Sequence, residues 1–218
     1  MDLPSNVHVS QHPCLRAKLS QLRSKNASAK EVKSLVSEIS LFIASEAMSS
    51  TLKVVDGPKD VSPIGAEYTT SVITPETICL VPILRSGLAM TEVHHLGLYR
   101  EPTTLEPVEY YNNLPNHLPQ GAAGDANQVP SLAFILDPVI ATGGTCAAAI
   151  QTLREWGARR IVVLSVIAAA EGIKRAADEW PEGVEIWVAG VDRELTDRGM
   201  LRPGLGDVGD RLFLTIGK

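Results

Sequence analysis

Hydrophobic positions in the first fifty residues recur at helical spacing. Leu15, Leu19 and Leu22 form one short stripe, and a longer stripe follows Ser28. The members of the longer stripe are Val32, Leu35, Val36, Ile39 and Ile43. This spacing predicts two amphipathic helices. Ser28 followed three residues later by Glu31 is the signature of a capping box, which places the start of the second helix.

The pattern changes after Thr77, where runs that are apolar on both faces alternate with helical stretches. The runs span residues 78–83, 132–136, 161–169 and 184–189. Continuous runs of this kind are typical of central strands in a parallel sheet covered on both sides. Helices are predicted over 145–156, ended by Gly157, and over 171–180, stopped by Pro181. The repeated order predicts an α/β fold with a central, mostly parallel sheet flanked by helices.

Two further segments interrupt this order. Residues 51–75 mix short apolar pieces with glycine and proline, which predicts short strands joined by turns rather than a linker between domains. The stretch 112–130 is polar, rich in proline and glycine, and longer than an ordinary connection. We predict a mobile flap, or hood, over 112–130.

Composition narrows the class of protein. A chain of 218 residues suits one compact α/β domain, 1–218, and its net charge of −5 gives no basic footprint for nucleic acid. Cys14, Cys79 and Cys146 are far apart and suggest neither a disulfide framework nor a zinc site. We find no pattern of a signal peptide and no apolar stretch of membrane-spanning length. We therefore expect a cytoplasmic protein without a nucleic-acid or membrane partner.

The most informative stretch is 134–145, where a buried strand ends in Asp137 and a turn of small residues opens a helix. The N–H groups of Gly143 and Gly144 can curl around a phosphate at the positive end of that helix. A carboxylate at this edge of the sheet can hold two ribose hydroxyls or a hydrated Mg²⁺. The pattern favours a sugar phosphate as ligand. The alternative is a plain strand-to-helix turn capped by Thr145; a Walker A site is excluded because no lysine follows the glycines.

A second glycine-rich segment, 204–209, matches G-x-G-x-x-G, but too little chain follows it for a dinucleotide fold. The loop 202–211 can read the edge of a flat heterocycle through its backbone, or it can be a turn before a final strand. Arg85 follows the strand at 78–83 and can bind a pyrophosphate, or it can be an ordinary surface arginine. Arg100 is ambiguous in the same way.

Taken together, these stretches resemble the uracil phosphoribosyltransferase family. The family motif D-P-M-L-A-T-G-G-S appears as D-P-V-I-A-T-G-G-T over 137–145, and V-P-I-L-R-A-G-L appears as V-P-I-L-R-S-G-L over 81–88. The segment Y-R-x-x-x-T-L-x-P-V is present over 99–108. P-G-L-G-D-A-G-D appears as P-G-L-G-D-V-G-D over 203–210. The likeness extends to the N-terminal helices within 1–50, so it covers nearly the whole chain.

The resemblance implies a type I phosphoribosyltransferase fold and reversible transfer of a phosphoribosyl group from phosphoribosyl pyrophosphate to N1 of uracil. The products would be UMP and pyrophosphate, as in pyrimidine salvage. Mg²⁺ would be bound through the donor's pyrophosphate, and no side-chain nucleophile is expected, because positioning and electrostatics carry such a reaction. The flap would exclude water. The resemblance further implies a homodimer or homotetramer, and it makes GTP a candidate allosteric activator, as in some members.

The resemblance also assigns roles to individual residues. Arg85 and Arg100 would bind the pyrophosphate and phosphate region of the donor, and Asp137 the ribose hydroxyls. The rest of the donor site would be formed by Pro138, Val139, Ile140, Ala141, Thr142, Gly143, Gly144 and Thr145. The uracil site, within the loop 199–211, would be lined by Leu201, Gly206, Asp207 and Val208, with Asp207 also facing the donor.

The chain departs from the family pattern in two places. Between Met90 and Tyr99 it is shorter by about ten residues, because either a helix has been lost or a stretch has been left out of the numbered sequence; we favour the second. Met200 stands where bacterial members usually carry tyrosine. Two alternatives therefore stay open: an enzyme acting on another base, and a non-catalytic, nucleotide-sensing regulator with the same fold.

Overall fold

The computed structural model describes residues 2–75, 78–83, 96–100, 107–112 and 131–213. Arg85 and nearly all of the predicted flap lie outside these residues, and Arg100 is described only as the last backbone position of a strand. The interpretation of 90–99 as an incomplete stretch concerns a segment that lies largely outside these residues, and it stays a prediction.

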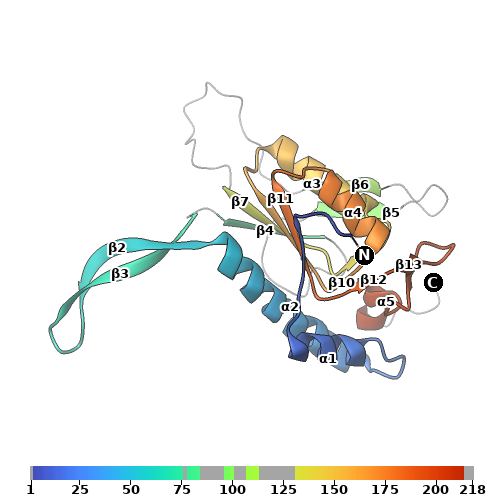
Figure 1. Cartoon of the computed structure of the whole chain (residues 1–218), viewed down its shortest axis with the longest axis horizontal. Helices are drawn as coiled ribbons and strands as arrows, with labels where there is room; N and C mark the ends of the chain where they lie inside the picture. Colours follow the sequence, from blue (N-terminus) through green and yellow to red (C-terminus); the bar gives the residue numbers. More distant parts are fainter. Residues whose placement is uncertain (1, 76–77, 84–95, 101–106, 113–130, 214–218) are drawn as a thin grey trace.

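A five-stranded parallel sheet forms the centre of the molecule (Figure 1). Its order is β1 (Val7–Val9), β11 (Val184–Val188), β9 (Ile161–Ser165), β7 (Leu132–Leu136) and β4 (Ile78–Pro82). Every neighbouring pair in it is parallel. The prediction of a mostly parallel sheet is confirmed, and the edge strand β1 is an addition that the sequence pattern did not indicate.

Helices cover both faces of this sheet. The helices α1 (Pro13–Leu22) and α2 (Ala29–Thr51) lie on one face, and α3 (Gly144–Trp156) and α4 (Ala170–Asp178) on the other (Figure 1). Side chains of β7 alternate between the two cores: Phe134 packs with the α1 and α2 side, and Ile135 packs with the α3 and α4 side. This two-sided burial explains why the strand is apolar at every position.

The capping box predicted for the second helix is present. The hydroxyl of Ser28 accepts a hydrogen bond from the backbone N–H of Glu31, and the Glu31 carboxylate accepts one from the N–H of Ser28. Together they satisfy two donors at the start of α2 that have no partner within the helix.

The apolar run 161–169 forms two strands rather than the single strand we predicted. After β9, the N–H groups of Val166 and Ile167 both donate to the carbonyl of Pro138, at 3.1 Å each. The chain is thereby diverted into β10 (Ile167–Ala169), which pairs with β8 (Val139–Ile140) and β12 (Val191–Asp192). This small parallel sheet extends the carboxyl edge of the main one, where the predicted site lies.

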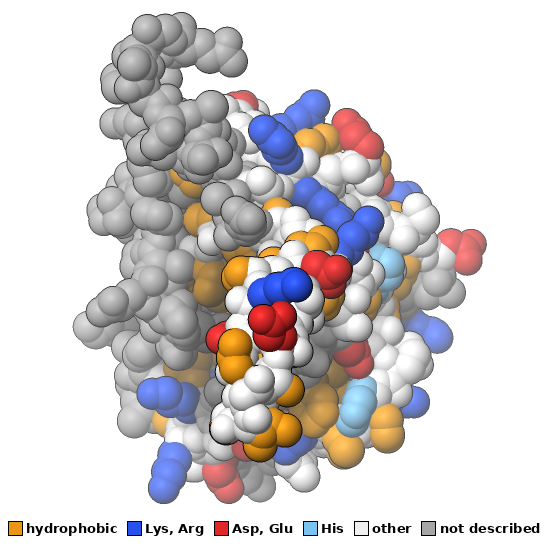
Figure 2. Space-filling view, turned by 90° about the vertical axis from the view of Figure 1, so that its left-hand side faces the viewer, with side chains coloured by type: hydrophobic (Ala, Val, Ile, Leu, Met, Phe, Trp, Pro, Cys, Tyr) orange, Lys and Arg blue, Asp and Glu red, His pale blue; other side chains and the backbone are white. Residues whose placement is uncertain are grey.

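Residues 51–75 form the predicted turn-linked strands, as one antiparallel hairpin of β2 (Lys53–Val61) and β3 (Glu67–Thr74). The hairpin projects away from the body of the molecule (Figure 1). Its exposed hydrophobic side chains are Val54, Val55, Val61, Ile64, Tyr68, Val72 and Ile73. Figure 2 views the molecule from this side and shows hydrophobic and charged side chains interspersed. Apolar surface this extensive on a two-stranded hairpin is unusual for an isolated chain.

The remaining elements are short. Strands β5 (Leu96–Arg100) and β6 (Pro107–Asn112) form an antiparallel pair, as do β13 (Glu194–Leu195) and β14 (Leu201–Arg202). The last described element is the helix α5 (Val208–Phe213). The segment directly after the glycines is helical, and a final strand beyond Phe213 lies outside the described residues. In the described part of the chain, no helix is long and apolar enough to cross a membrane.

Candidate active site

The predicted phosphate loop lies at the carboxyl edge of the sheet. Asp137 follows the last residue of β7, and its backbone N–H donates to the carbonyl of Leu164 at 3.1 Å. After β8 the chain turns and enters α3 through Gly143, whose φ is +77°. A residue with a side chain is disfavoured there. The N-terminal end of α3 consequently points its free N–H groups and its positive dipole end toward the loop.

Space as well as conformation requires a glycine at 143. A Cβ atom at this position would lie 2.1 Å from the carbonyl oxygen of Gly172, in the first turn of α4. A Cβ atom at Gly172 would in turn lie 2.0 Å from the carbonyl oxygen of Ala141. The backbone of the phosphate loop therefore rests directly on the backbone of α4. Gly172 is a supporting residue that our sequence reasoning did not identify.

Asp137 is the most strongly perturbed carboxyl group of the site. Its side chain is almost fully buried, and burial raises its pKa from 3.8 to about 7, while a hydrogen bond from the backbone of Val139 opposes the rise. A carboxylate removed from water is a strong acceptor for hydroxyl groups or a partner for a cation. The buried position therefore suits a carboxylate that interacts with a bound ligand.

Cys146 lies beside Asp137, in the first turn of α3. Burial, and after it the charge of Asp137, hold the pKa of the Cys146 thiol well above its usual range. A thiol that stays protonated is a weak nucleophile. Cys146 therefore contributes shape to the site rather than a reactive anion.

The second loop faces the first one. It leaves β14, passes Gly204 and Gly206 with φ values of +65° and +71°, and enters α5. Asp207 caps that helix, because its side-chain oxygen accepts a hydrogen bond from the backbone N–H of Asp210 at 3.0 Å. The cap explains why the chain becomes helical immediately after the glycines.

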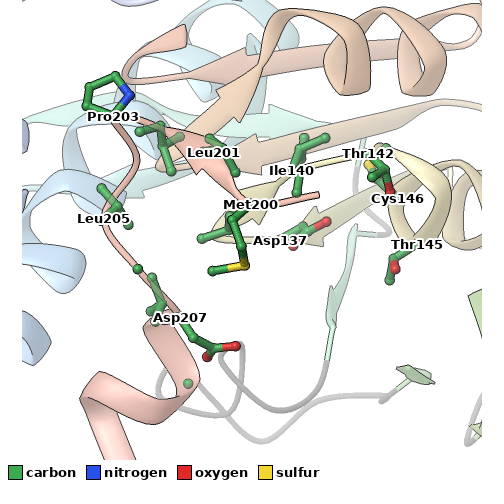
Figure 3. Close-up of a pocket in the computed structure, with 17 residues that line it drawn as sticks. Asp137, Ile140, Thr142, Thr145, Cys146, Met200, Leu201, Pro203, Leu205 and Asp207 are labelled. Carbon is green, nitrogen blue, oxygen red and sulfur yellow. The ribbon is translucent and has the colours of Figure 1, made fainter. Parts of the chain in front are cut away.

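The two loops enclose one cavity of about 400 Å³. Figure 3 shows Asp137 and Thr145 on one side of it, Asp207 on the other, and Met200 between the two aspartates. The predicted residues that line it are Asp137, Val139, Ile140, Ala141, Thr142, Gly143, Thr145, Leu201, Gly206, Asp207 and Val208. Pro138 and Gly144 do not line it. The volume is within the usual range for a small-molecule site.

Several lining residues were not among the predicted site residues: Cys146, Ile167, Pro203, Leu205 and Gly209. Pro203, Leu205 and Gly209 lie within the motif 203–210, and Cys146 directly follows Thr145, so the motifs already marked this part of the site. Ile167 comes from β10, which reaches the site only by pairing with β8. No local signal in the sequence marks it.

The described residues also bear on metal binding. They contain no group of three or more histidine, cysteine, aspartate or glutamate side chains that could hold a metal ion. The cavity does present the carboxylates of Asp137 and Asp207. One or two carboxylates, together with oxygens supplied by a phosphorylated substrate, form a donor set that fits Mg²⁺.

The parallel sheet, the glycine turn into α3 and the carboxylate at the end of β7 define a protein of the type I phosphoribosyltransferase class. The model of the uracil phosphoribosyltransferase family matches residues 9–215, and the chain belongs to that family.

Individual relatives agree over nearly their full lengths. The chain is 40% identical to a uracil phosphoribosyltransferase of Finegoldia magna, over 97% of this chain and 99% of the relative. It is 39% identical to one of Bacillus cereus, over 96% and 98%. Among solved structures, the AQ2163 protein from Aquifex aeolicus is similar with a TM-score of 0.83 and 30% identity, over 96% of this chain and 98% of that one.

Proposed function

We propose that this chain transfers the phosphoribosyl group of 5-phospho-α-D-ribose 1-diphosphate to N1 of uracil, producing UMP and pyrophosphate. The observation that carries the proposal is the meeting of two glycine-containing loops in one cavity: the loop that leads into α3 and the loop that leads into α5. A chain of the uracil phosphoribosyltransferase family with both halves of this cavity has a place for the donor and for the base.

The donor half binds the sugar phosphate. The N–H groups from Ala141 to Thr145, at the positive end of α3, receive the 5′-phosphate. Asp137 accepts hydrogen bonds from the ribose hydroxyls, and these bonds are strong because the carboxylate is shielded from water. By their match to the family motifs, Arg85 and Arg100 are assigned to the pyrophosphate of the donor. Both assignments are tested by alanine substitution.

The base half reads uracil. Leu201 and the residues from Gly206 to Val208 line the cavity, and a planar heterocycle with alternating donors and acceptors matches an edge of backbone groups. By its match to the family's uracil loop, Asp207 is assigned to both substrates.

The reaction breaks the bond between C1′ and the pyrophosphate oxygen and forms the bond between C1′ and N1 of uracil. The electron pair of the broken bond leaves with pyrophosphate, and the N1 proton passes to solvent. Fixed positioning of both substrates and stabilisation of the developing charges supply the rate. Mg²⁺ on the donor, when bound, would neutralise the charge of the leaving pyrophosphate.

We further propose that the chain acts as a cytoplasmic homo-oligomer in which a second copy covers the β2–β3 hairpin. Val54 and Ile73 pair across the hairpin with exposed fractions of 70% and 50%. The same hairpin carries both lysine and acidic side chains, including the pair Lys59 and Glu67. Mixed charge around apolar residues suits contact with an identical surface, since each sign then meets its opposite.

The test is UMP formation from uracil and the donor with Mg²⁺, run beside cytosine, hypoxanthine and orotate. We expect turnover with uracil alone, and a loss of about 100-fold in Asp137→Asn, because two charge-assisted hydrogen bonds are weakened. Turnover with a different base would instead establish the alternative that Met200 leaves open. Binding of the donor without turnover on any base would contradict the enzyme and favour the nucleotide-sensing regulator. Repeating the assay with GTP tests allosteric activation.

A further inference from the structure

The loop 199–211, which we call the base loop, is held by a partly buried ion pair on the side away from the cavity. Arg23 follows the last residue of α1, and Asp192 ends β12 with only 4% of its surface exposed. The guanidinium meets the carboxylate through two contacts, Nη1 to Oδ2 at 3.0 Å and Nη2 to Oδ1 at 2.5 Å. This fork geometry fixes the direction of both side chains.

Both polar backbone groups of Gly204 form hydrogen bonds with this ion pair. The N–H of Gly204 donates to Oδ2 of Asp192 at 2.8 Å, and its carbonyl accepts from Nη1 of Arg23 at 2.9 Å. Gly204 has a positive φ, and a Cβ atom there would lie 2.3 Å from the carbonyl oxygen of Leu201. Glycine leaves the backbone free to rotate, so these contacts determine where the loop lies.

A second arginine ties the same loop to the same helix. Nη1 of Arg211 donates to the carbonyl oxygens of Leu22 and Leu205, each at 2.7 Å, and its Nη2 donates to that of Ser24 at 2.8 Å. The end of α1 therefore contacts the base loop through two independent guanidinium groups.

Neither Arg23 nor Asp192 is among the residues that line the cavity. They reach the site only through Gly204, two residues before the backbone groups assigned to uracil. Recognition by backbone needs those groups held within about half an ångström of their productive positions. An ion pair behind the loop supplies that constraint, whereas the net stability gained from a partly buried ion pair is small.

We propose that Arg23 and Asp192 are positioning residues that set the base loop for uracil without touching it. The proposal rests on the proposed function, because it names which substrate these residues serve. It predicts that replacing either residue raises the KM for uracil far more than the KM for the donor. The phosphate loop, which is assigned to the donor, lies on a different pair of elements.

The experiment compares Arg23→Lys, Arg23→Gln and Asp192→Asn with the control Lys18→Gln. Lys18 forms an ion pair with Glu38 that joins α1 to α2 away from the cavity. For Arg23→Gln and Asp192→Asn we expect the KM for uracil to rise by about tenfold or more, the value for losing one strong hydrogen bond, with the KM for the donor nearly unchanged. Arg23→Lys keeps the positive charge but cannot make the paired guanidinium contacts. Its KM for uracil should therefore lie between those of the wild type and Arg23→Gln. The control should match the wild type.

A parallel rise of both KM values, or a fall in thermal stability alone, would overturn the proposal. Hydrogen exchange of the backbone amides at 204–208 supplies a readout that does not depend on activity. Faster exchange there in Asp192→Asn, and not in Lys18→Gln, is expected; unchanged exchange would contradict the positioning role. A wild type that forms no UMP would refute the proposed function, whereas an active wild type with unaffected variants would refute only the positioning role.

Discussion

Gly143 and Gly172 lie so close together that neither position has room for a Cβ atom. One belongs to the phosphate loop and the other to the first turn of α4, so the loop is braced by helix backbone rather than by a side chain. A side chain can change rotamer to relieve crowding, but a helical backbone cannot. The contact therefore makes the loop position sensitive to a single methyl group.

Gly172→Ala tests this contact. The added methyl would lie 2.0 Å from the carbonyl oxygen of Ala141, which must move. We expect the free energy of unfolding to fall by about 1–3 kcal/mol and the KM for the donor to rise. Urea unfolding and steady-state kinetics measure the two effects.

The sign of the stability change is informative, because alanine normally favours a helix over glycine by about 1 kcal/mol. Lys174→Ala, at an exposed position of the same helix, is the matched control and should leave both quantities near wild type. A Gly172→Ala protein that is more stable than wild type and binds the donor normally would show that the loop can relax.

Asp137 should make stability depend on pH. Its pKa rises from 3.8 to about 7 on folding, so between these values the folded protein holds a proton that the unfolded chain has released. The free energy of unfolding then falls as pH rises through about 7. The shift corresponds to at most about 4 kcal/mol.

Asp137→Asn lacks this titration. Measured by urea unfolding without substrates, its stability relative to wild type should increase between pH 5 and pH 8. Parallel pH profiles for the two proteins would mean that the Asp137 carboxyl group titrates normally in the folded state.

Met200 should influence the choice of base. Its backbone is fixed by a tight turn, since its N–H donates to the Thr196 hydroxyl at 3.1 Å and its carbonyl accepts from the Thr196 N–H at 2.7 Å. The side chain extends into the cavity (Figure 3). In Met200→Ala the ratio of kcat/KM for 5-methyluracil over uracil should rise by about tenfold, the usual effect of space for one methyl group.

Arg198→Ala serves as the control for Met200, because Arg198 is exposed in the same turn and does not line the cavity. An unchanged ratio in Met200→Ala would place the selection of the base elsewhere in the loop.

The β2–β3 hairpin should govern self-association. Replacing Val54 and Ile73 together by aspartate puts charge on both members of an exposed apolar pair. We expect the oligomer to dissociate, as measured by light scattering after size-exclusion chromatography. Thr69→Asp adds a charge to an exposed polar position of the same hairpin and should leave the mass unchanged. If the variant with aspartate at both Val54 and Ile73 had the same mass as Thr69→Asp, this hairpin would be excluded as the interface.

The turn from β7 into α3 could be predicted because the information for it is local. A buried strand, a carboxylate and two glycines occupy one continuous segment, and each acts through the backbone next to it. The capping box of Ser28 and Glu31 was predictable for the same reason. Local chemistry was enough in both cases.

Contacts between distant segments could not be read in the same way. Gly172 and Ile167 contribute to the site because β10 pairs with β8 and because α4 follows directly. The break at Val166 depends on the carbonyl of Pro138, which lies in another strand connection. A pattern of hydrophobic residues records that a segment is buried, but it does not record which segment lies beside it.

The link between Arg211 and Leu22 joins positions 189 residues apart. A ribosome therefore makes the two halves of the cavity at different times: strand β7 and the phosphate loop are in place on the chain well before the base loop is synthesised. The carbonyl groups at the end of α1 are synthesised early, but Arg211, which donates hydrogen bonds to them, is synthesised almost last. A chain released before Gly204 would carry the phosphate loop but lack the loop with Asp207 that faces it across the cavity, so translation that stops early would leave a protein with no place for the base.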